Sequence, residues 1–422
     1  MFFTPKRLKL YLWALLVLQI IICLGFRSSV RSGAIDLRTY YTAGYMLRTG
    51  QASLLYDVPA ETVLQNQLIA PMPGALAFFA PPFAALPFAP LSLLPYHQAF
   101  WLLLAINLVL LLLTARIMRP HLNALATRWP PLPFLLFLTF IPAGLTLVMG
   151  QLSILMLLLF CASFVLLQSG RPILAGLVLA LALIKFQLVI PVVLIFLLWR
   201  QWRFLLGFLT GSALLAALSI LLVGLRESQL YLHTLLSHSG PLDAASSGTM
   251  NVSVDRMPNL YGLLATLTRH QHLSLMLAIA ACLGLIAWAA LRPASLPLAL
   301  LISLCAGLYL FPCDLTLLLL PLSLLSDRLF AEDSTTYTTT PPAPSQPSRL
   351  PWLQHRRRAI LLCAIGTFLI GPLLIEIIVN NLIPTLALPI LALAFIPYDW
   401  STLTLPRASD TRAAAESHPT TI

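Results

Sequence analysis

Acidic side chains are rare in this sequence, with fourteen Asp and Glu among 422 residues. A carboxylate is a common general base for a hydroxyl group, and Asp36 is the best placed because it follows a long apolar segment by about ten residues. It would reach a cavity at the membrane surface and take a proton from an acceptor hydroxyl. Arg38, two residues further on, would bind a phosphate. The alternative is a solvated loop acid beside a basic residue.

Lys185 lies among Leu and Ile residues in an apolar run. An ammonium group in hydrocarbon costs free energy, so such residues usually face a cavity or a partner. With an anionic lipid phosphate as partner, Lys185 would bind a lipid-linked donor substrate. The alternatives are an ion pair with Asp314 or a side chain that snorkels at a short hairpin tip. Asp314 itself would orient Lys185 or an acceptor hydroxyl, or would cap the next helix.

Other polar residues have weaker signals. Asp57 precedes Pro59 and is favoured as a helix N-cap over a chemical role. His233 and His238 are five residues apart, which is not same-face helical spacing, so a zinc site is not expected. Either histidine would be a proton shuttle, a phosphate ligand or an ordinary loop residue. We predict no metal site and no cofactor.

The elements that position these residues must lie in a membrane. The chain is 59% apolar and 9% charged, whereas a soluble domain carries roughly 25% charged residues. Leu8–Phe26, Phe100–Met118 and Phe204–Leu225 are long enough to cross about 30 Å of hydrocarbon as helices. The net charge of +11 comes from basic residues between apolar segments, as the positive-inside rule requires, so nucleic acid is not an expected partner.

Two long apolar runs have polar interruptions, at Gly150–Ser153 and at Lys185–Gln187. We interpret each run as a hairpin of two helices whose turn reaches the outer side. The segment Phe78–Pro95 is rich in proline and should be a kinked or re-entrant piece. Thr39–Arg48 and Pro59–Ile69 should form short helices on the membrane surface.

The predicted fold class is an all-α polytopic membrane protein with about 11–13 transmembrane helices and a large first periplasmic loop that carries short juxtamembrane helices. The N-terminus should be cytoplasmic. The predicted segments are a cytoplasmic N-terminus and first span (1–26), a first periplasmic loop with the catalytic Asp (27–75), a transmembrane core (76–225), a second periplasmic loop (226–271), transmembrane helices (272–326), a disordered cytoplasmic loop (327–358), a C-terminal hairpin (359–397) and a cytoplasmic tail (398–422).

Several short motifs, in their order along residues 30 to 325, resemble glycosyltransferase family 87. This family belongs to the GT-C superfamily and includes mycobacterial mannosyltransferases that use polyprenyl-phosphate sugars. Each motif is weak alone, and the order and spacing carry the specificity. The motifs are Asp36 with Tyr40–Ala43, Gly50 and Leu55–Asp57; Ala80–Phe83, Pro90–Pro95, Trp101 and Asn107; Gly150–Gln151, Ala175–Gly176, Ile184–Lys185 and Trp199–Arg203; and Met257–Gly262, Asp314–Leu315 and Leu318–Pro321.

The resemblance implies a GT-C fold whose cavity opens to the periplasm, with Asp36 as the catalytic base and no metal requirement. It also implies a polyprenyl-phosphate-linked hexose donor, often mannose. Phe186 follows Lys185 where the family often has proline, a departure that bears on the donor site. The predicted donor-phosphate ligands are Lys185, Arg38, Arg256 and His238, and the predicted acceptor or structural residues are Tyr41, Tyr56, Asp57, Gln151, Gln187, Asn259 and Asp314.

We therefore expect a hexosyltransferase of the bacterial inner membrane that acts on a lipid or cell-envelope glycan acceptor. Its other partners would be membrane lipids. One alternative is a transporter or flippase of a polar lipid, which commonly has inverted repeats that this sequence lacks. The other alternative is an assembly protein of the envelope, which would not require Asp36 and Lys185 together.

Overall fold

The computed structural model describes residues 5–72, 76–237, 254–307, 309–336 and 351–395, and all regular structure in these ranges is helical. The α-helices are α1 (Pro5–Gly25), α2 (Arg27–Ser32), α3 (Leu37–Arg48), α4 (Val58–Leu68), α5 (Phe88–Leu91), α6 (Tyr96–Met118), α7 (Asn123–Arg128), α8 (Leu132–Leu138), α9 (Ile141–Met149), α10 (Ser153–Gln168), α11 (Pro172–Ala180), α12 (Phe186–Leu198), α13 (Trp202–Val223), α14 (Leu225–Ser237), α15 (Leu260–Thr268), α16 (Gln271–Ala290), α17 (Leu296–Ala306), α18 (Leu319–Thr336), α19 (Pro351–Leu369), α20 (Gly371–Val379) and α21 (Ala387–Phe395).

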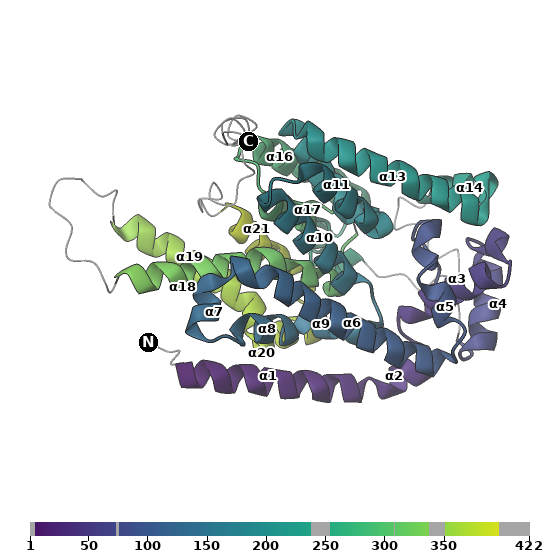
Figure 1. Cartoon of the computed structure of the whole chain (residues 1–422), viewed down its shortest axis with the longest axis horizontal. Helices are drawn as coiled ribbons and strands as arrows, with labels where there is room; N and C mark the ends of the chain where they lie inside the picture. Colours follow the sequence, from purple (N-terminus) through teal and green to yellow (C-terminus); the bar gives the residue numbers. More distant parts are fainter. Residues whose placement is uncertain (1–4, 73–75, 238–253, 308, 337–350, 396–422) are drawn as a thin grey trace, which may run out of the picture.

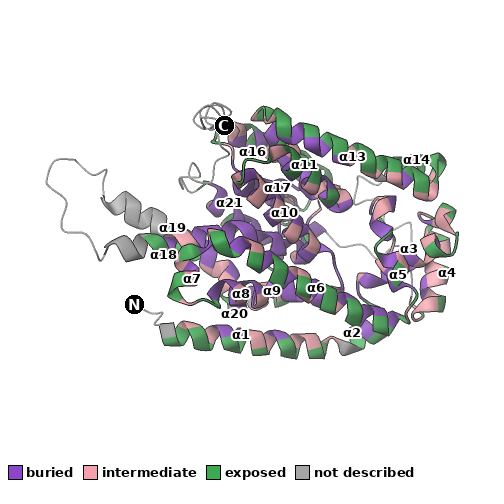
Figure 2. Cartoon of the chain, viewed as in Figure 1, coloured by how far each residue is buried: buried purple, intermediate pink, exposed green. Residues whose placement is uncertain are grey.

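Short 3₁₀ helices connect several of these elements. They are η1 (Ala52–Leu54), η2 (Pro82–Ala85), η3 (Arg119–His121), η4 (Leu181–Lys185), η5 (Val254–Arg256), η6 (Pro312–Leu318) and η7 (Ile383–Leu386). The predicted all-α class is confirmed, and this is a multi-pass membrane protein. Figure 2 shows exposed residues along the outer helices α1, α6 and α13, and many of these are large apolar side chains that would face lipid.

Five helical runs within the described residues are long and apolar enough to cross a membrane, and two bent helix pairs raise the number to seven. Four shorter apolar helices accompany them. The predicted count of about 11–13 therefore needs the short helices as well as the long ones. The runs are Lys6–Ser32, Tyr96–His121, Pro172–Leu198, Trp202–Val223 and Gln271–Ala290; the bent pairs join α8 to α9 and α19 to α20; the short helices are Pro82–Leu91, Ser153–Gln168, Leu296–Ala306 and Ile383–Phe395.

The run Pro172–Leu198 reverses direction at Lys185, although its length alone would allow one crossing. Lys185 has φ −121° and ψ 68°, which are not helical values. A side chain on Gly176 or Gly207 would collide with the backbone of Phe204 or Ile173, respectively. The start of α13 therefore lies against the start of α11, so α12 must return to that end. These glycines let the two backbones approach closely, so the chain reverses at Lys185 as the hairpin prediction requires, and the outer-side position of the turn stays a prediction.

The helices of the predicted first loop (27–75) lie together at one end of the molecule (Figure 1). Here α3, α4 and α5 lie near α14, whereas α7, α18 and α19 lie at the opposite end. The two predicted surface helices correspond to α3 and α4. Asp57 is the N-cap of α4, since its Oδ1 accepts a hydrogen bond from the Ala60 N–H at 3.0 Å. The capping prediction is confirmed.

The proline-rich segment forms only the short helices η2 and α5, so it is a broken piece as predicted. Proline removes backbone donors, and the apolar stretch Pro82–Leu91 is interrupted at Leu86–Pro87, between η2 and α5. This segment packs on the first loop: Gly44 of α3 meets the backbone of Phe88 so closely that a side chain at position 44 would not fit. Tyr41 and Tyr56 fasten it further, since their hydroxyls donate to the carbonyls of Leu94 and Ala80.

A buried carboxyl group links α4 to the same segment. Glu61 is 2% exposed, and the Phe78 N–H donates to both of its carboxyl oxygens at 3.1 and 3.3 Å. Burial raises the pKa of Glu61 to about 8, against the smaller lowering effect of the Phe78 N–H. Glu61 is therefore protonated at neutral pH.

We predict that Glu61→Gln removes a pH dependence of stability. The pKa of Glu61 is about 4.3 in the unfolded chain, so between about pH 4 and about pH 8 the folded state binds more protons. The free energy of unfolding of the wild type then falls as pH rises through this window. Gln is neutral throughout, so the melting temperature of the variant should rise relative to that of the wild type between pH 5 and about pH 8. A difference that is constant with pH would contradict the assignment.

Candidate active site

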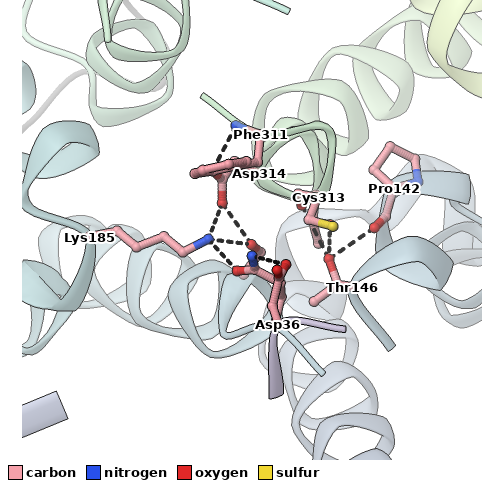
Figure 3. Close-up of polar contacts among 10 residues, drawn as sticks. Asp36, Pro142, Thr146, Lys185, Phe311, Cys313 and Asp314 are labelled. Atoms are coloured by element: carbon pink, nitrogen blue, oxygen red, sulfur yellow. Dashed lines mark hydrogen bonds and ion pairs between the residues drawn. The ribbon is translucent and has the colours of Figure 1, made fainter. Parts of the chain in front are cut away.

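Four predicted site residues meet where four elements end or begin. Asp36 precedes α3, Gln151 precedes α10, Lys185 ends η4 and Asp314 lies in η6. Figure 3 shows Lys185 pointing toward Asp314, with Asp36 beside them. Lys185, Gln151 and Asp314 are buried, and Asp36 is half-buried.

Helix lengths explain why Gln151 and Lys185 lie at the same level. The helix α10 has 16 residues and rises about 24 Å, and the chain then turns at Ser169–Arg171. The return through nine residues of α11 and five of η4 also rises about 24 Å. Gly150 ends α9 with φ +64°, so the chain can leave α9 and start α10 within three residues.

Lys185 uses all three of its ammonium protons within the site. Its Nζ donates to Asp314 Oδ1 at 2.5 Å, to Gln151 Oε1 at 2.8 Å and to Ser153 Oγ at 3.0 Å. An ammonium group has three donors and no acceptor. In this arrangement Lys185 therefore has no proton left for a phosphate, and its predicted role as a phosphate ligand stays a prediction.

The ion pair decides how Gln151 is oriented. An ammonium group only donates, so the amide oxygen of Gln151 must face Lys185 and its NH₂ group must point the other way. That group donates to Asp36 Oδ2 at 2.5 Å. Lys185 thus positions Gln151, and Gln151 holds one oxygen of Asp36.

The second oxygen of Asp36, Oδ1, receives no hydrogen bond from any residue in the described ranges. Burial raises the pKa of Asp36, and the Gln151 hydrogen bond and the Lys185 charge oppose this effect. A carboxylate with a raised pKa and one free oxygen suits a general base.

Asp314 is held from both sides. Its Oδ1 accepts from Lys185 and from Ser153 Oγ, and its Oδ2 accepts from the backbone N–H of Phe311 at 3.1 Å. The ion pair with Lys185 is therefore present. The N-cap of η6 is Phe311, and Asp314 satisfies the Phe311 N–H from the N3 position rather than as the predicted N-cap. The hydroxyl of Thr146 on α9 lies 3.0 Å from that of Thr316 in η6 and thus fixes η6 beside α9.

Arg38 is not part of this cluster. It is fully buried, and its guanidinium donates to Gln65 Oε1, Asn66 Oδ1 and the Ala70 carbonyl, all at or beyond the end of α4. It therefore holds α4 against α3. Its predicted contact with a phosphate stays a prediction, for which only Nη1 has no partner.

The remaining predicted residues lie elsewhere. Asn259 caps α15 through Gly262 N–H and donates to the Gly307 carbonyl, so its role is structural. Gln187 is half-buried and Arg256 is exposed, and neither joins the four-residue cluster. His238 lies outside the described residues.

Two residues near the site, Ser153 and Tyr40, appear in the sequence motifs but were given no role at the site. Ser153 bridges Lys185 and Asp314, and it stands in the polar interruption Gly150–Ser153 that predicted the turn. Tyr40 lies one helical turn after Asp36, and burial raises its pKa to about 12, with the charges of Lys185 and Asp36 as smaller influences. The spacing from Asp36 to Tyr40 was the available signal for a shared helix face.

Among known families, the model of glycosyltransferase family 87 matches residues 78–326, more than half of the chain. The chain belongs to glycosyltransferase family 87. The match contains Gln151, Lys185 and Asp314, and it starts after Asp36. A search of curated proteins and a search of solved structures gave no match. The family is one of transferases, so the protein is a membrane glycosyltransferase rather than a transporter or an assembly protein.

Replacing one partner of the Lys185–Asp314 ion pair should destabilise the protein more than replacing both partners. Lys185→Met leaves Asp314 buried without its counter-charge, which costs about 3–5 kcal/mol of the free energy of unfolding. Adding Asp314→Leu removes the unpaired charge, so the double variant should recover most of that loss. Thermal unfolding in detergent measures both. A double variant as unstable as Lys185→Met would contradict this view of the pair.

Gln151→Leu should shift the pH dependence of sugar transfer. The Gln151 hydrogen bond lowers the pKa of Asp36, so its loss raises that pKa further, and a higher pH is needed to ionise the base. The acidic limb of the pH–rate profile should shift to higher pH, and the rate should recover at alkaline pH. Gln201→Leu, at the start of α13, is the matched control. A uniform loss at every pH would contradict the role of Gln151.

Proposed function

We propose that this family 87 enzyme moves a hexose, with mannose favoured, from a polyprenyl-phosphate-linked donor to a lipid or cell-envelope glycan acceptor. The site would face the periplasmic side of a bacterial inner membrane. The observation that carries the proposal is the pair of oxygens on Asp36: Gln151 holds Oδ2, and Oδ1 is left for an acceptor hydroxyl.

The proposed reaction inverts the anomeric carbon in one displacement. Asp36 Oδ1 takes the proton of the acceptor hydroxyl while the hydroxyl oxygen forms a bond to that carbon. The bond from the carbon to the donor phosphate oxygen breaks, and polyprenyl phosphate leaves with the electron pair. Phosphate is a good leaving group, so the proposed mechanism has no general acid and no metal.

The raised pKa of Asp36 suits this step. A carboxylate that holds a proton more firmly is a stronger base toward a hydroxyl group. The ion pair of Lys185 and Asp314 positions Gln151. Because the pair has no net charge, it does not repel an anionic donor from the site. Asp36 lies four residues beyond the candidate membrane span Lys6–Ser32, which supports a substrate that stays in the membrane.

Asp36→Asn should reduce sugar transfer by at least about 100-fold, because the amide cannot accept the proton of the acceptor hydroxyl. Asn keeps the shape of Asp, and Gln151 can still donate to its side-chain oxygen, so folding and donor binding should change little. The measurement is transfer of radiolabel from a polyprenyl-phosphate hexose in membranes.

Asp57→Asn is the matched control in the same loop. Asn caps a helix about as well as Asp, so this variant should keep its activity. An Asp36→Asn variant that transfers sugar at the wild-type rate would rule out Asp36 as the base. A wild type that consumes no polyprenyl-phosphate sugar would overturn the donor assignment.

A further inference from the structure

A hollow of about 480 Å³ lies beside the first loop, on the side of α3 where α2 and α6 meet. It is lined by Val30 and Arg31 of α2, by Leu68 and Ile69 at the end of α4, and by Tyr96 and His97 at the start of α6. The site described above does not use any of these residues. Three of its six lining residues are aliphatic, and the other three carry hydrogen-bonding groups.

The donors of this pocket suit an anion. Arg31 and His97 are both exposed, and no described residue forms an ion pair with Arg31. His97 Nε2 accepts a hydrogen bond from Trp101 Nε1 at 3.1 Å, so the neutral ring carries its proton on Nδ1 and can donate it. The helix α6 starts here without a side-chain cap, which adds the free N–H groups of a helix N-terminus.

The lining residue Tyr96 carries a buried hydroxyl without a partner, and a second such atom, Arg38 Nη1, lies behind the lining residue Ile69. Arg38 Nη1 and the Tyr96 hydroxyl are buried and make no hydrogen bond. Arg38 is fully buried, and Tyr96 is 7% exposed. A side-chain carbon on Gly33 would lie 2.8 Å from Arg38 Nη1 and would also meet Ile69, so this nitrogen lies beside the pocket wall. Buried donors without partners are rare and point to a ligand or water.

Beyond the pocket toward its C-terminal end, α6 has an exposed apolar stripe. Trp101, Leu102, Ile106 and Val109 are 39–63% exposed and lie within the run Tyr96–His121 that can cross a membrane. A lipid chain would pack along this stripe while its head group entered the pocket.

We propose that this pocket binds the phosphodiester of a membrane lipid, with Arg31 and His97 as ligands and the Tyr96 hydroxyl as the inner donor. Guanidinium groups match the oxygens of a phosphate well. The Lys185 ammonium has no free proton, so this pocket provides the anion contacts that the site cluster lacks. The binding itself does not depend on Asp36 being the base.

The test is equilibrium binding by the purified full chain in detergent. The two radiolabelled probes are a polyprenyl-phosphate hexose and phosphatidylglycerol, and diacylglycerol is the uncharged reference. Arg31→Gln should weaken binding of at least one anionic probe by about 10-fold or more, because it removes a charge-assisted hydrogen bond. His97→Gln should weaken the same probe, and diacylglycerol should be unaffected.

Arg226→Gln is the matched control, since Arg226 is also exposed and lies on α14 at the same end of the molecule. It should leave binding unchanged. If the pocket variants bind the polyprenyl-phosphate hexose more weakly, the pocket is a donor site. If they bind phosphatidylglycerol more weakly, it is a phospholipid site. Both results support the inference. Binding that is unchanged in both pocket variants, or a wild type that binds neither probe, would overturn it. Binding without sugar transfer would contradict the proposed function alone.

Discussion

The ion pair between Lys185 and Asp314 is the interaction on which the site depends. Both residues are buried among apolar helices, where either charge alone would be costly. The pair therefore requires the turn between η4 and α12 to meet η6. Because every ammonium proton is used, the pair also fixes the amide of Gln151 and, through it, one oxygen of Asp36. A charge pair that takes no direct part in the proposed reaction thus sets the geometry of Asp36, the proposed base.

The surrounding helices keep this pair in place. Gly176 and Gly207 allow α11 and α13 to pack with their backbones close together, which brings the chain back after Lys185. On the other side, Thr146 and Thr316 hold η6 against α9. The first loop is fixed separately, by Arg38 across α3 and α4 and by Glu61 against Phe78. Asp36 stands where these two packed regions meet, which explains its restricted position and its raised pKa.

Much of this arrangement could be predicted from local signals. An isolated Lys in an apolar run, a Gly-Gln interruption and an Asp before a proline indicated a turn, a break and a cap, and each is present. The role of Arg38 could not be predicted, because its partners on α4 and just beyond it lie 27 to 32 residues away in the chain. Neither could the loss of every free proton on Lys185, since this depends on three acceptors from distant elements.

The most direct measurement is an experimental structure of the wild-type protein with an acceptor and a non-transferable polyprenyl-phosphate sugar analogue. We expect the acceptor hydroxyl within about 3 Å of Asp36 Oδ1, and Gln151 still donating to Oδ2. Lys185 should remain bound to Asp314. An acceptor hydroxyl placed away from Asp36, or Lys185 turned from Asp314 to a ligand, would contradict the account.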